Sequence, residues 1–391
     1  MYKKILIILT LILGASFFCC HYLSKKNHFP DKNKTTIQFA SWGSESEVNI
    51  LKPLLSDFEK NNPNIRVEFL HIPQNYFQKI HLLFASNTAP DVIFINNQYL
   101  PIYANAGVLE DLSPYSKDLD FKDFYDKSLK ALTWKGKVYA VPRDVSTLVI
   151  FYNKDLFNKY HVPYPNKNWT FDEFLGISKK LTHRPKVFGI SFEEEPLFFL
   201  PYLTSEGGGF KKDILKDKTN CEALNFYADL RTKYHVAPLK EESASVTMAQ
   251  MFLQKKLAMH LSGRWLVPKY RQEAKFDWDV VEFPQGKNGS IVPLDASGWA
   301  IAKASKHKKE ALMLIKYLSS KESSEKFTTS GLIVPARIDV AKSAYFLDNQ
   351  KPKNSKVFLN VIETSQPTFV TVNYREILDS IKDKTEYIFN K

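Results

Sequence analysis

The chain has 391 residues, of which 44% are hydrophobic and 25% are charged, a composition that fits a globular protein long enough for two domains. Its formal net charge is +12, but the lysines are scattered, so a solvated surface is favoured over a nucleic-acid interface. The sequence contains no nucleophile elbow, no phosphate-binding P-loop and no pair of metal ligands at a characteristic spacing. These features favour a protein that holds a ligand over an enzyme, and we expect no cofactor and no metal.

The N-terminus is typical of a secretory signal that ends in a lipidation site. Two lysines precede an apolar run, Ile5 to Phe18, that is too short to span a bilayer comfortably. The run ends at Cys19 and Cys20, and of these Cys20 is the better candidate for lipidation; an ordinary or uncleaved signal is the alternative. Residues 1–20 are therefore predicted to be a signal, and the polar, basic residues 21–34 a flexible tether. This arrangement predicts a lipid-anchored or periplasmic protein of the cell envelope.

Apolar periodicity after the tether alternates between strands and helices. Strands are predicted at 36–41, 65–70 and 92–95, and helices over 48–58, 77–84 and 99–106. Such alternation indicates a parallel or mixed sheet with helices on both faces.

The remainder of the chain continues this α/β pattern with two interruptions. Extended runs at 138–141 and 147–152 flank Pro142-Arg143-Asp144, which we interpret as a crossing between two lobes. Thr170 and Glu173 form a capping box at the start of a helix. Later strands are predicted at 187–192, 257–261, 278–282 and 294–302, and later helices at 220–233, 246–255, 308–319 and 374–389, with a further crossing at 332–335.

Several segments carry a family resemblance through their order and spacing. They read PDVIF at 90–94, AGVLEDL at 106–112, FYNKDLF at 151–157, NWTFDEF at 168–174 and AMHLSGRW at 258–265. With these segments the chain resembles the extracellular solute-binding proteins of family 1, the sugar-binding lipoproteins of ABC importers, of which maltose-binding proteins are the best-known members. The resemblance covers nearly the whole chain after the tether.

The resemblance implies a two-lobed α/β fold of the periplasmic-binding-protein kind, with ligand held between the lobes. The N-terminal lobe would comprise residues 35–145 and 298–334, and the C-terminal lobe residues 146–297 and 335–391. The chain would be a monomer that captures a sugar and delivers it to permease subunits, with the ATPase on a separate chain. Ligand binding would favour closure of the lobes.

Sugar recognition needs aromatic rings for the apolar ring faces and paired donors and acceptors for the hydroxyls. Trp265 is the strongest candidate, because the resemblance implies that its ring stacks on a pyranose. Arg264 was not expected beside it and is predicted either to pair with Glu195 or to meet an acidic group on the ligand. The resemblance also implies that Glu195, just before Pro196, presents a carboxylate to the sugar. The further candidates lie at predicted strand ends and crossings: Trp42, Ser44, Glu45, Asn97, Asp144, Asp295, Ser297, Gly298, Trp299 and Arg337.

Other interpretations of these candidates and of the whole chain stay open at this point. Trp42 and Ser44 also fit a core ring and a helix cap. Gly298 would let the backbone approach a ligand closely. A binder of glycerol 3-phosphate or a glycerophosphodiester is the main alternative function, favoured by the positive charge and Arg264. A glycoside hydrolase is less favoured, because no motif identifies a pair of catalytic carboxylates.

Overall fold

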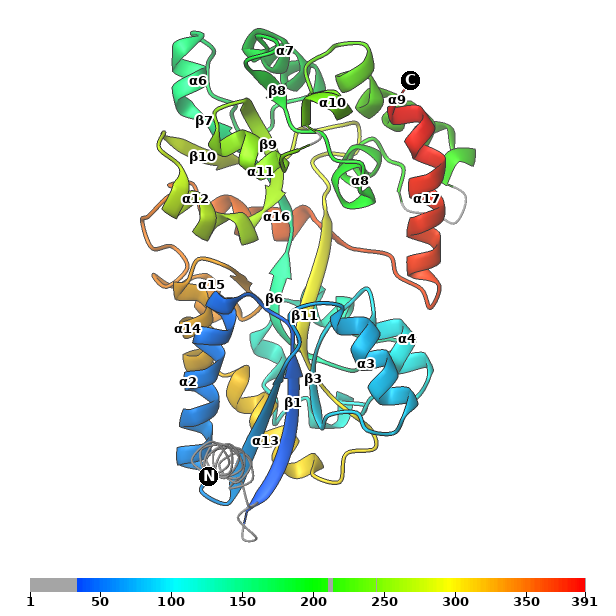
Figure 1. The fold of residues 1–391 in the computed structure, drawn as a ribbon, viewed down its shortest axis with the longest axis vertical. Coiled ribbons are helices and arrows are strands. Elements are labelled where there is room, and N and C mark those ends of the chain that lie inside the picture. Colours follow the sequence, from blue (N-terminus) through cyan, green and yellow to red (C-terminus); the bar gives the residue numbers. More distant parts are fainter. Residues whose placement is uncertain (1–33, 210–213, 244, 391) are drawn as a thin grey trace, which may run out of the picture.

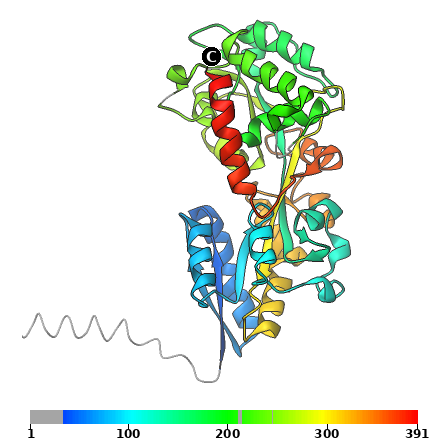
Figure 2. The same ribbon diagram turned by 90° about the vertical axis from the view of Figure 1, so that its right-hand side faces the viewer.

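The computed structural model describes residues 34–209, 214–243 and 245–390, and these form two lobes along one long axis (Figure 1). We call the lobe built on the seven-stranded sheet the N-terminal lobe and the lobe built on the four-stranded sheet the C-terminal lobe. Figure 2 shows the same two lobes from the side, with the last helix running along the C-terminal lobe. The predicted two-lobed α/β fold is confirmed.

The N-terminal lobe has a mixed sheet in the order β12-β6-β11-β3-β1-β2, with β13 paired to the start of β11. Its strands are β1 (Thr35–Ser41), β2 (Ile65–His71), β3 (Val92–Asn96), β6 (Val141–Ser146), β11 (Pro293–Ile301), β12 (Val334–Pro335) and β13 (Gln366–Pro367). The helices around it are α2 (Glu45–Asn61), α3 (Tyr76–Ala85), α4 (Leu100–Asn105), α5 (Asp126–Ala131), α13 (Lys308–Leu318), α14 (Lys321–Thr329) and α15 (Ile338–Ala341). A small hairpin, β4 (Thr133–Trp134) with β5 (Lys137–Val138), stands apart from the sheet.

The C-terminal lobe is built on a sheet in the order β10-β7-β9-β8. Its strands are β7 (Leu148–Asn153), β8 (Phe188–Ile190), β9 (Leu257–Gly263) and β10 (Trp278–Val281). Its helices are α6 (Lys154–Lys159), α7 (Phe171–Leu181), α8 (Pro196–Ser205), α9 (Lys218–Thr232), α10 (Lys240–Ser243), α11 (Met248–Leu253), α12 (Val267–Glu273), α16 (Lys356–Thr364) and α17 (Tyr374–Phe389).

Local sequence explains where two of the helices begin. The Ser44 hydroxyl accepts a hydrogen bond from the Glu47 backbone N–H, and the Glu47 carboxylate accepts one from the Ser44 N–H, so a capping box begins α2. The capping box predicted at Thr170 and Glu173 is confirmed at the start of α7. Both helices bury one apolar face against a sheet, and this packing fixes the position of their N-terminal ends.

The two lobes are joined by extended segments at a narrow waist. β6 belongs to the first sheet and β7 to the second, and Thr147 alone separates them. Pro142, Arg143 and Asp144 were predicted to lie between two strands, but they lie within β6, where Pro142 pairs with Gly298 of β11 beside a bulge that leaves Arg143 without a partner in the register. The proline is tolerated where the strand register shifts. The lobe boundaries at 145/146, 297/298 and 334/335 stay predictions.

Candidate functional site

The first strand of the N-terminal lobe leads directly into a hollow at the waist. β1 ends at Ser41, and Trp42 follows with its ring packed on Tyr76, Phe77 and Phe94, at centroid distances of 5.1, 5.2 and 4.3 Å. One edge of the ring stays open and lines two adjoining hollows of about 220 and 700 Å³. Trp42 is therefore both part of the packing and part of a surface that a ligand can reach.

The smaller hollow lies between the lobes, so we call it the interlobe cleft. From the N-terminal lobe it is lined by Trp42, Glu47, Ser297 and residues 143–146, from the C-terminal lobe by Arg264 and Trp265, and at the waist by residues 332–334. Strand ends from both sheets thus meet there, as is usual for ligand sites in α/β proteins.

Trp265 reaches the cleft through a turn that depends on a glycine. β9 ends at Gly263, and the chain turns through a short 3₁₀ helix, Arg264–Leu266, which leaves Trp265 36% exposed. The Trp265 ring folds back over Gly263 so closely that a methyl group there would lie 1.9 Å from its Cζ3 atom. The glycine therefore sets where the ring stands.

A buried charge network forms one wall of the cleft. The Arg143 guanidinium donates to Asp144 at 2.5 Å and to Glu47 at 3.1 Å, and it stacks on the Phe94 ring at 4.2 Å. Burial raises the pKa of Asp144, and the charge of Arg143 opposes that rise. Two carboxylates around one guanidinium give this wall acceptors for hydroxyl groups without an unpaired positive charge.

Glu47 was missed as a candidate, although the sequence carried a signal for it. Ser44-x-x-Glu47 is a readable capping box, and a helix that begins directly after a strand end places its first turn at the site. The contact with Arg143, 96 positions away, was not readable from local pattern.

Five of the predicted site residues line the interlobe cleft, namely Trp42, Asp144, Arg264, Trp265 and Ser297. Two more, Ser44 and Glu45, line the adjoining larger hollow, although the Ser44 hydroxyl is used as a helix cap. Their roles in ligand binding stay predictions.

The structure gives the other predicted residues different partners. The Asn97 side chain is buried and donates to Asp295 at 2.9 Å, while the Asp295 carboxylate also accepts from Gln98 at 3.0 Å. Trp299 is fully buried in the core of the N-terminal lobe, with its ring 4.7 Å from that of Phe94. We therefore correct the expectation that Asn97, Asp295 and Trp299 face the ligand, because all three are engaged in holding β3 and β11 together.

Gly298 and Arg337 also have structural roles. A methyl group at Gly298 would lie 2.0 Å from the Val141 carbonyl oxygen, so glycine is needed for close packing of β11 on β6, not for approach of a ligand. Arg337 is buried and pairs with Asp123 at 2.8 Å and with Asp339 at 3.1 Å, away from the cleft.

The predicted pairing of Arg264 with Glu195 is wrong. Glu195, at the N-cap of α8, instead pairs with Lys382 of α17 and is not among the residues that line the interlobe cleft. A role for Glu195 in ligand binding stays a prediction. The Arg264 Nε donates to the Ile333 carbonyl at 3.1 Å, and its guanidinium stacks on the Phe346 ring at 4.1 Å. Neither terminal nitrogen of Arg264 has a hydrogen-bond partner within the described chain, and burial lowers its pKa to about 9.

The described residues also bear on the expectations about metal ions, membrane spans and cysteines. Over residues 34–209, 214–243 and 245–390, no group of three or more histidine, cysteine or acidic side chains is arranged to hold a metal ion. Across those same ranges no helix is both long and apolar enough to cross a bilayer. Cys221 is partly buried, and its thiol lies near the Leu215 carbonyl oxygen. Cys19 and Cys20 lie outside the described residues.

Comparison with known proteins identifies the family. The model for bacterial extracellular solute-binding proteins matches residues 54–353. The chain belongs to this family. Members of this family are substrate-binding proteins of transporters.

Relatives and solved structures of this solute-binding protein include sugar binders. It is 25% identical to the maltodextrin-binding protein MdxE of Bacillus subtilis, over 91% of this chain and 86% of that one. The ABC substrate-binding protein Lmo0181 of Listeria monocytogenes, solved with cycloalternan, has 28% identity and a TM-score of 0.82, covering 91% of this chain and 94% of that one. UgpB of Mycobacterium tuberculosis, solved with glycerophosphocholine, shares the fold at 20% identity and a TM-score of 0.78, covering 91% and 93%.

Proposed function

We propose that this protein captures a sugar or oligosaccharide in the interlobe cleft and delivers it to the permease of an ABC importer. The observation that carries the proposal is the exposed Trp265 ring, which shares one cleft with Trp42 of the other lobe. Rings offered from two sides suit the two apolar faces of a pyranose or successive sugar units. The names of relatives that bind maltodextrin and cycloalternan support the same ligand class.

The polar wall of the cleft favours hydroxyl groups over a charged ligand. Glu47 and Asp144 both bind Arg143, so the positive charge that faces the cleft is already compensated. Arg264, on which an anionic ligand would depend, is buried and bound to the Ile333 carbonyl. The alternative of a glycerol phosphodiester has a fold relative in its favour. It would depend on the two terminal nitrogens of Arg264, which have no hydrogen-bond partner within the described chain.

We propose that the protein is not an enzyme. Hydrolysis of a glycosidic bond requires two carboxyl groups on opposite sides of the bond, roughly 5–9.5 Å apart. The carboxylates that line the interlobe cleft, Glu47 and Asp144, come from the same lobe and converge on one guanidinium. This arrangement supports binding without bond cleavage.

We also propose lipidation at Cys20, with Cys19 as the second candidate, and a location in the cell envelope. The family is extracellular, and the apolar run ending at Cys19 and Cys20 supports an anchor followed by the tether of residues 21–34. The protein would act as a monomer beside the permease.

A thermal-shift screen of a soluble form, residues 21–391, tests the proposed ligand class. All described helices and strands lie between residues 35 and 389, so this form keeps the whole folded body. A ligand that binds only the folded state raises the unfolding temperature by mass action. Maltodextrins, cycloalternan, galactooligosaccharides, glycerol 3-phosphate and glycerophosphocholine would be compared.

The proposal predicts a rise with at least one saccharide that disappears in Trp265→Ala. Tyr387→Ala is the matched control, because Tyr387 is an exposed ring on α17, outside the cleft. A rise in unfolding temperature with phosphate esters alone would contradict the proposal and favour a binding protein for glycerol 3-phosphate or a glycerophosphodiester. A saccharide shift that Trp265→Ala leaves intact would contradict the proposed site.

A further inference from the structure

The far end of the N-terminal lobe carries a cluster of lysines that the proposed sugar site does not use. Lys34 stands at the entry of the chain into β1, Lys303 and Lys306 lie in the turn after β11, and Lys309 and Lys316 lie on α13. All five side chains are exposed, and none forms an ion pair within the described part of the chain. We call these five residues the basic end face.

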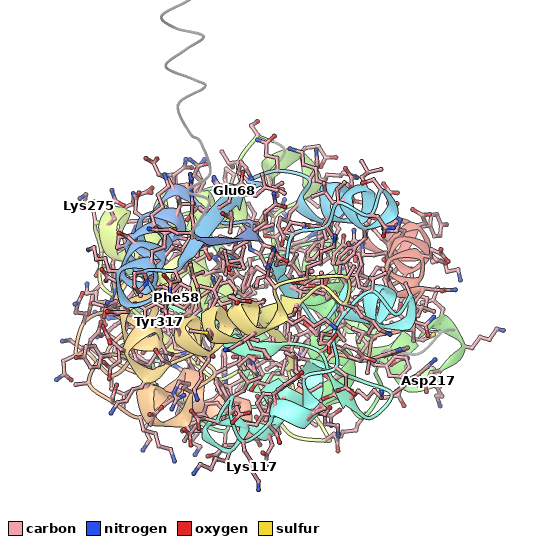
Figure 3. All side chains as sticks on the ribbon, turned by 90° about the horizontal axis from the view of Figure 1, so that it is seen from below. Phe58, Glu68, Lys117, Asp217, Lys275 and Tyr317 are labelled. Carbon is pink, nitrogen blue, oxygen red and sulfur yellow. The ribbon has the colours of Figure 1, made fainter. Side chains whose placement is uncertain are left out.

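The fold brings these lysines together on one end of the molecule. α13 packs against β1 and α2, and Figure 3, which looks onto this end, shows α13 lying across it. Lys309 and Lys316 are seven positions apart, so they lie on the same side of the helix, opposite its buried apolar stripe. A hollow of about 600 Å³ next to them is lined by Thr36, Lys303 and Lys306, which places the start of β1 beside the turn.

The acidic groups at this end are mostly engaged elsewhere. Glu110 pairs with Lys308 at 2.7 Å, and the two oxygens of Asp91 accept from the Gln38 N–H and the Ser305 hydroxyl. Glu68 accepts from the Gln38 side chain, and Glu310 lies on α13 between the two exposed lysines. Asp91, Glu68 and Glu310 keep their negative charges, because the groups bonded to Asp91 and Glu68 are neutral and Glu310 forms no ion pair within the described part of the chain. The five lysines outnumber these three carboxylates, so the end face keeps a net positive charge.

We propose that the basic end face binds an anionic lipid surface, so that the N-terminal lobe rests end-on against the membrane. The inference rests on the lipid anchor proposed above, because the tether enters the fold at Lys34, within this face. A flexible segment of 14 residues has an end-to-end distance of about 20 Å, which is within a few Debye lengths of the bilayer. A basic patch would add an electrostatic contact to the one that the lipid anchor makes.

Charge complementarity makes an anionic bilayer the expected partner and sets the expected gain in membrane affinity. A lysine near an anionic bilayer strengthens binding by about five-fold, and the attraction weakens as salt screens it. An uncharged bilayer offers no such gain. A sugar ligand would not compete, because the face lies at the opposite end of the lobe from the interlobe cleft.

Sedimentation of the soluble form, residues 21–391, with lipid vesicles tests this inference. Vesicles of phosphatidylcholine would be compared with vesicles of phosphatidylcholine and phosphatidylglycerol, at low and high salt. The test variant carries Lys303→Gln, Lys306→Gln, Lys309→Gln and Lys316→Gln. The matched control carries the same charge change at four exposed lysines of the C-terminal lobe that form no ion pair within the described chain, namely Lys167→Gln, Lys180→Gln, Lys186→Gln and Lys256→Gln.

The inference predicts binding to the anionic vesicles only, lost at high salt and weakened at least about 20-fold in the test variant but under about five-fold in the control. Equal weakening in both variants, or equal binding to both kinds of vesicle, would overturn it. The saccharide thermal shift, measured on the test variant, separates the two proposals. An intact saccharide shift shows that the variant folds, whatever the fate of membrane binding, and a missing shift in the wild type contradicts only the sugar site.

Discussion

Replacing Gly263 by alanine tests how the cleft positions its most exposed ring. A methyl group at this position would lie 1.9 Å from Cζ3 of Trp265 and 2.3 Å from its Cε3, which no side-chain contact allows. Gly263 is buried at the end of β9, whereas the Trp265 ring is 36% exposed, so the ring is the part that moves. We expect Gly263→Ala to turn the ring away from its position in the cleft.

The size of the effect follows from the area that the ring offers to a ligand. A tryptophan side chain presents about 250 Å² when fully exposed, so 36% leaves about 90 Å² for contact. At about 25 cal/mol per Å², losing that contact weakens saccharide binding by about 2 kcal/mol, or about 30-fold. We expect the free energy of unfolding to change little, because the exposed ring can rotate toward the solvent.

Titration calorimetry with the saccharide that gives the largest thermal shift measures this loss directly. Gly176→Ala is the matched control, because Gly176 lies inside α7 with no atom within 4 Å of the added methyl group. The control is expected to bind saccharide normally and to gain about 0.5–1 kcal/mol in stability from helix propensity. Wild-type affinity in Gly263→Ala together with weak binding in Trp265→Ala would refute the idea that this glycine positions the ring.

Three further predictions concern stability and are read from urea unfolding. Gly298→Ala forces a methyl group against the Val141 carbonyl oxygen and should lower the unfolding free energy by about 1–3 kcal/mol; an unchanged midpoint would contradict the packing. Burial lowers the pKa of His260 to about 3, so below pH 6.5 the unfolded state takes up a proton that the folded state does not. Stability should therefore fall by about 2 kcal/mol between pH 8 and pH 5, a loss that His260→Gln, which keeps an acceptor for Tyr270, should abolish; the same slope in both proteins would show another group at work. Arg264→Met removes a buried, incompletely bonded cation and should leave the unfolding free energy unchanged or higher by about 1 kcal/mol, whereas a loss above about 3 kcal/mol would mean that its terminal nitrogens have partners.

Local patterns in the sequence were sufficient for most elements of the fold. The spacing of Val48, Leu51 and Phe58 predicted the buried face of α2, and the Thr170 capping box marked the start of α7. α8 was missed because it begins at Pro196 and contains Pro201, two residues that usually argue against a helix interior. The first proline stands in the first turn, where its missing N–H has no partner to lose.

Residues of the site could be predicted where a single local signal, such as the end of a strand or a family motif, marks their position. Trp42 follows β1 directly, and Trp265 lies two residues after the end of β9. The strand pattern indicated Trp42, and the family resemblance indicated Trp265. Asn97 and Asp295 also follow or cross strands, but their hydrogen bond joins residues 198 positions apart, and no local pattern records it. The ion pair between Glu195 and Lys382 could not be predicted for the same reason, because the two residues are far apart in the sequence.

The central claim is that a saccharide binds between Trp42 and Trp265, and titration calorimetry on Trp42→Ala and Trp265→Ala tests it most directly. The account predicts one saccharide per chain in the wild type and a loss of at least about tenfold in affinity in each variant, because each removes a ring that lines the cleft. Saccharide binding with wild-type affinity in both variants would contradict it.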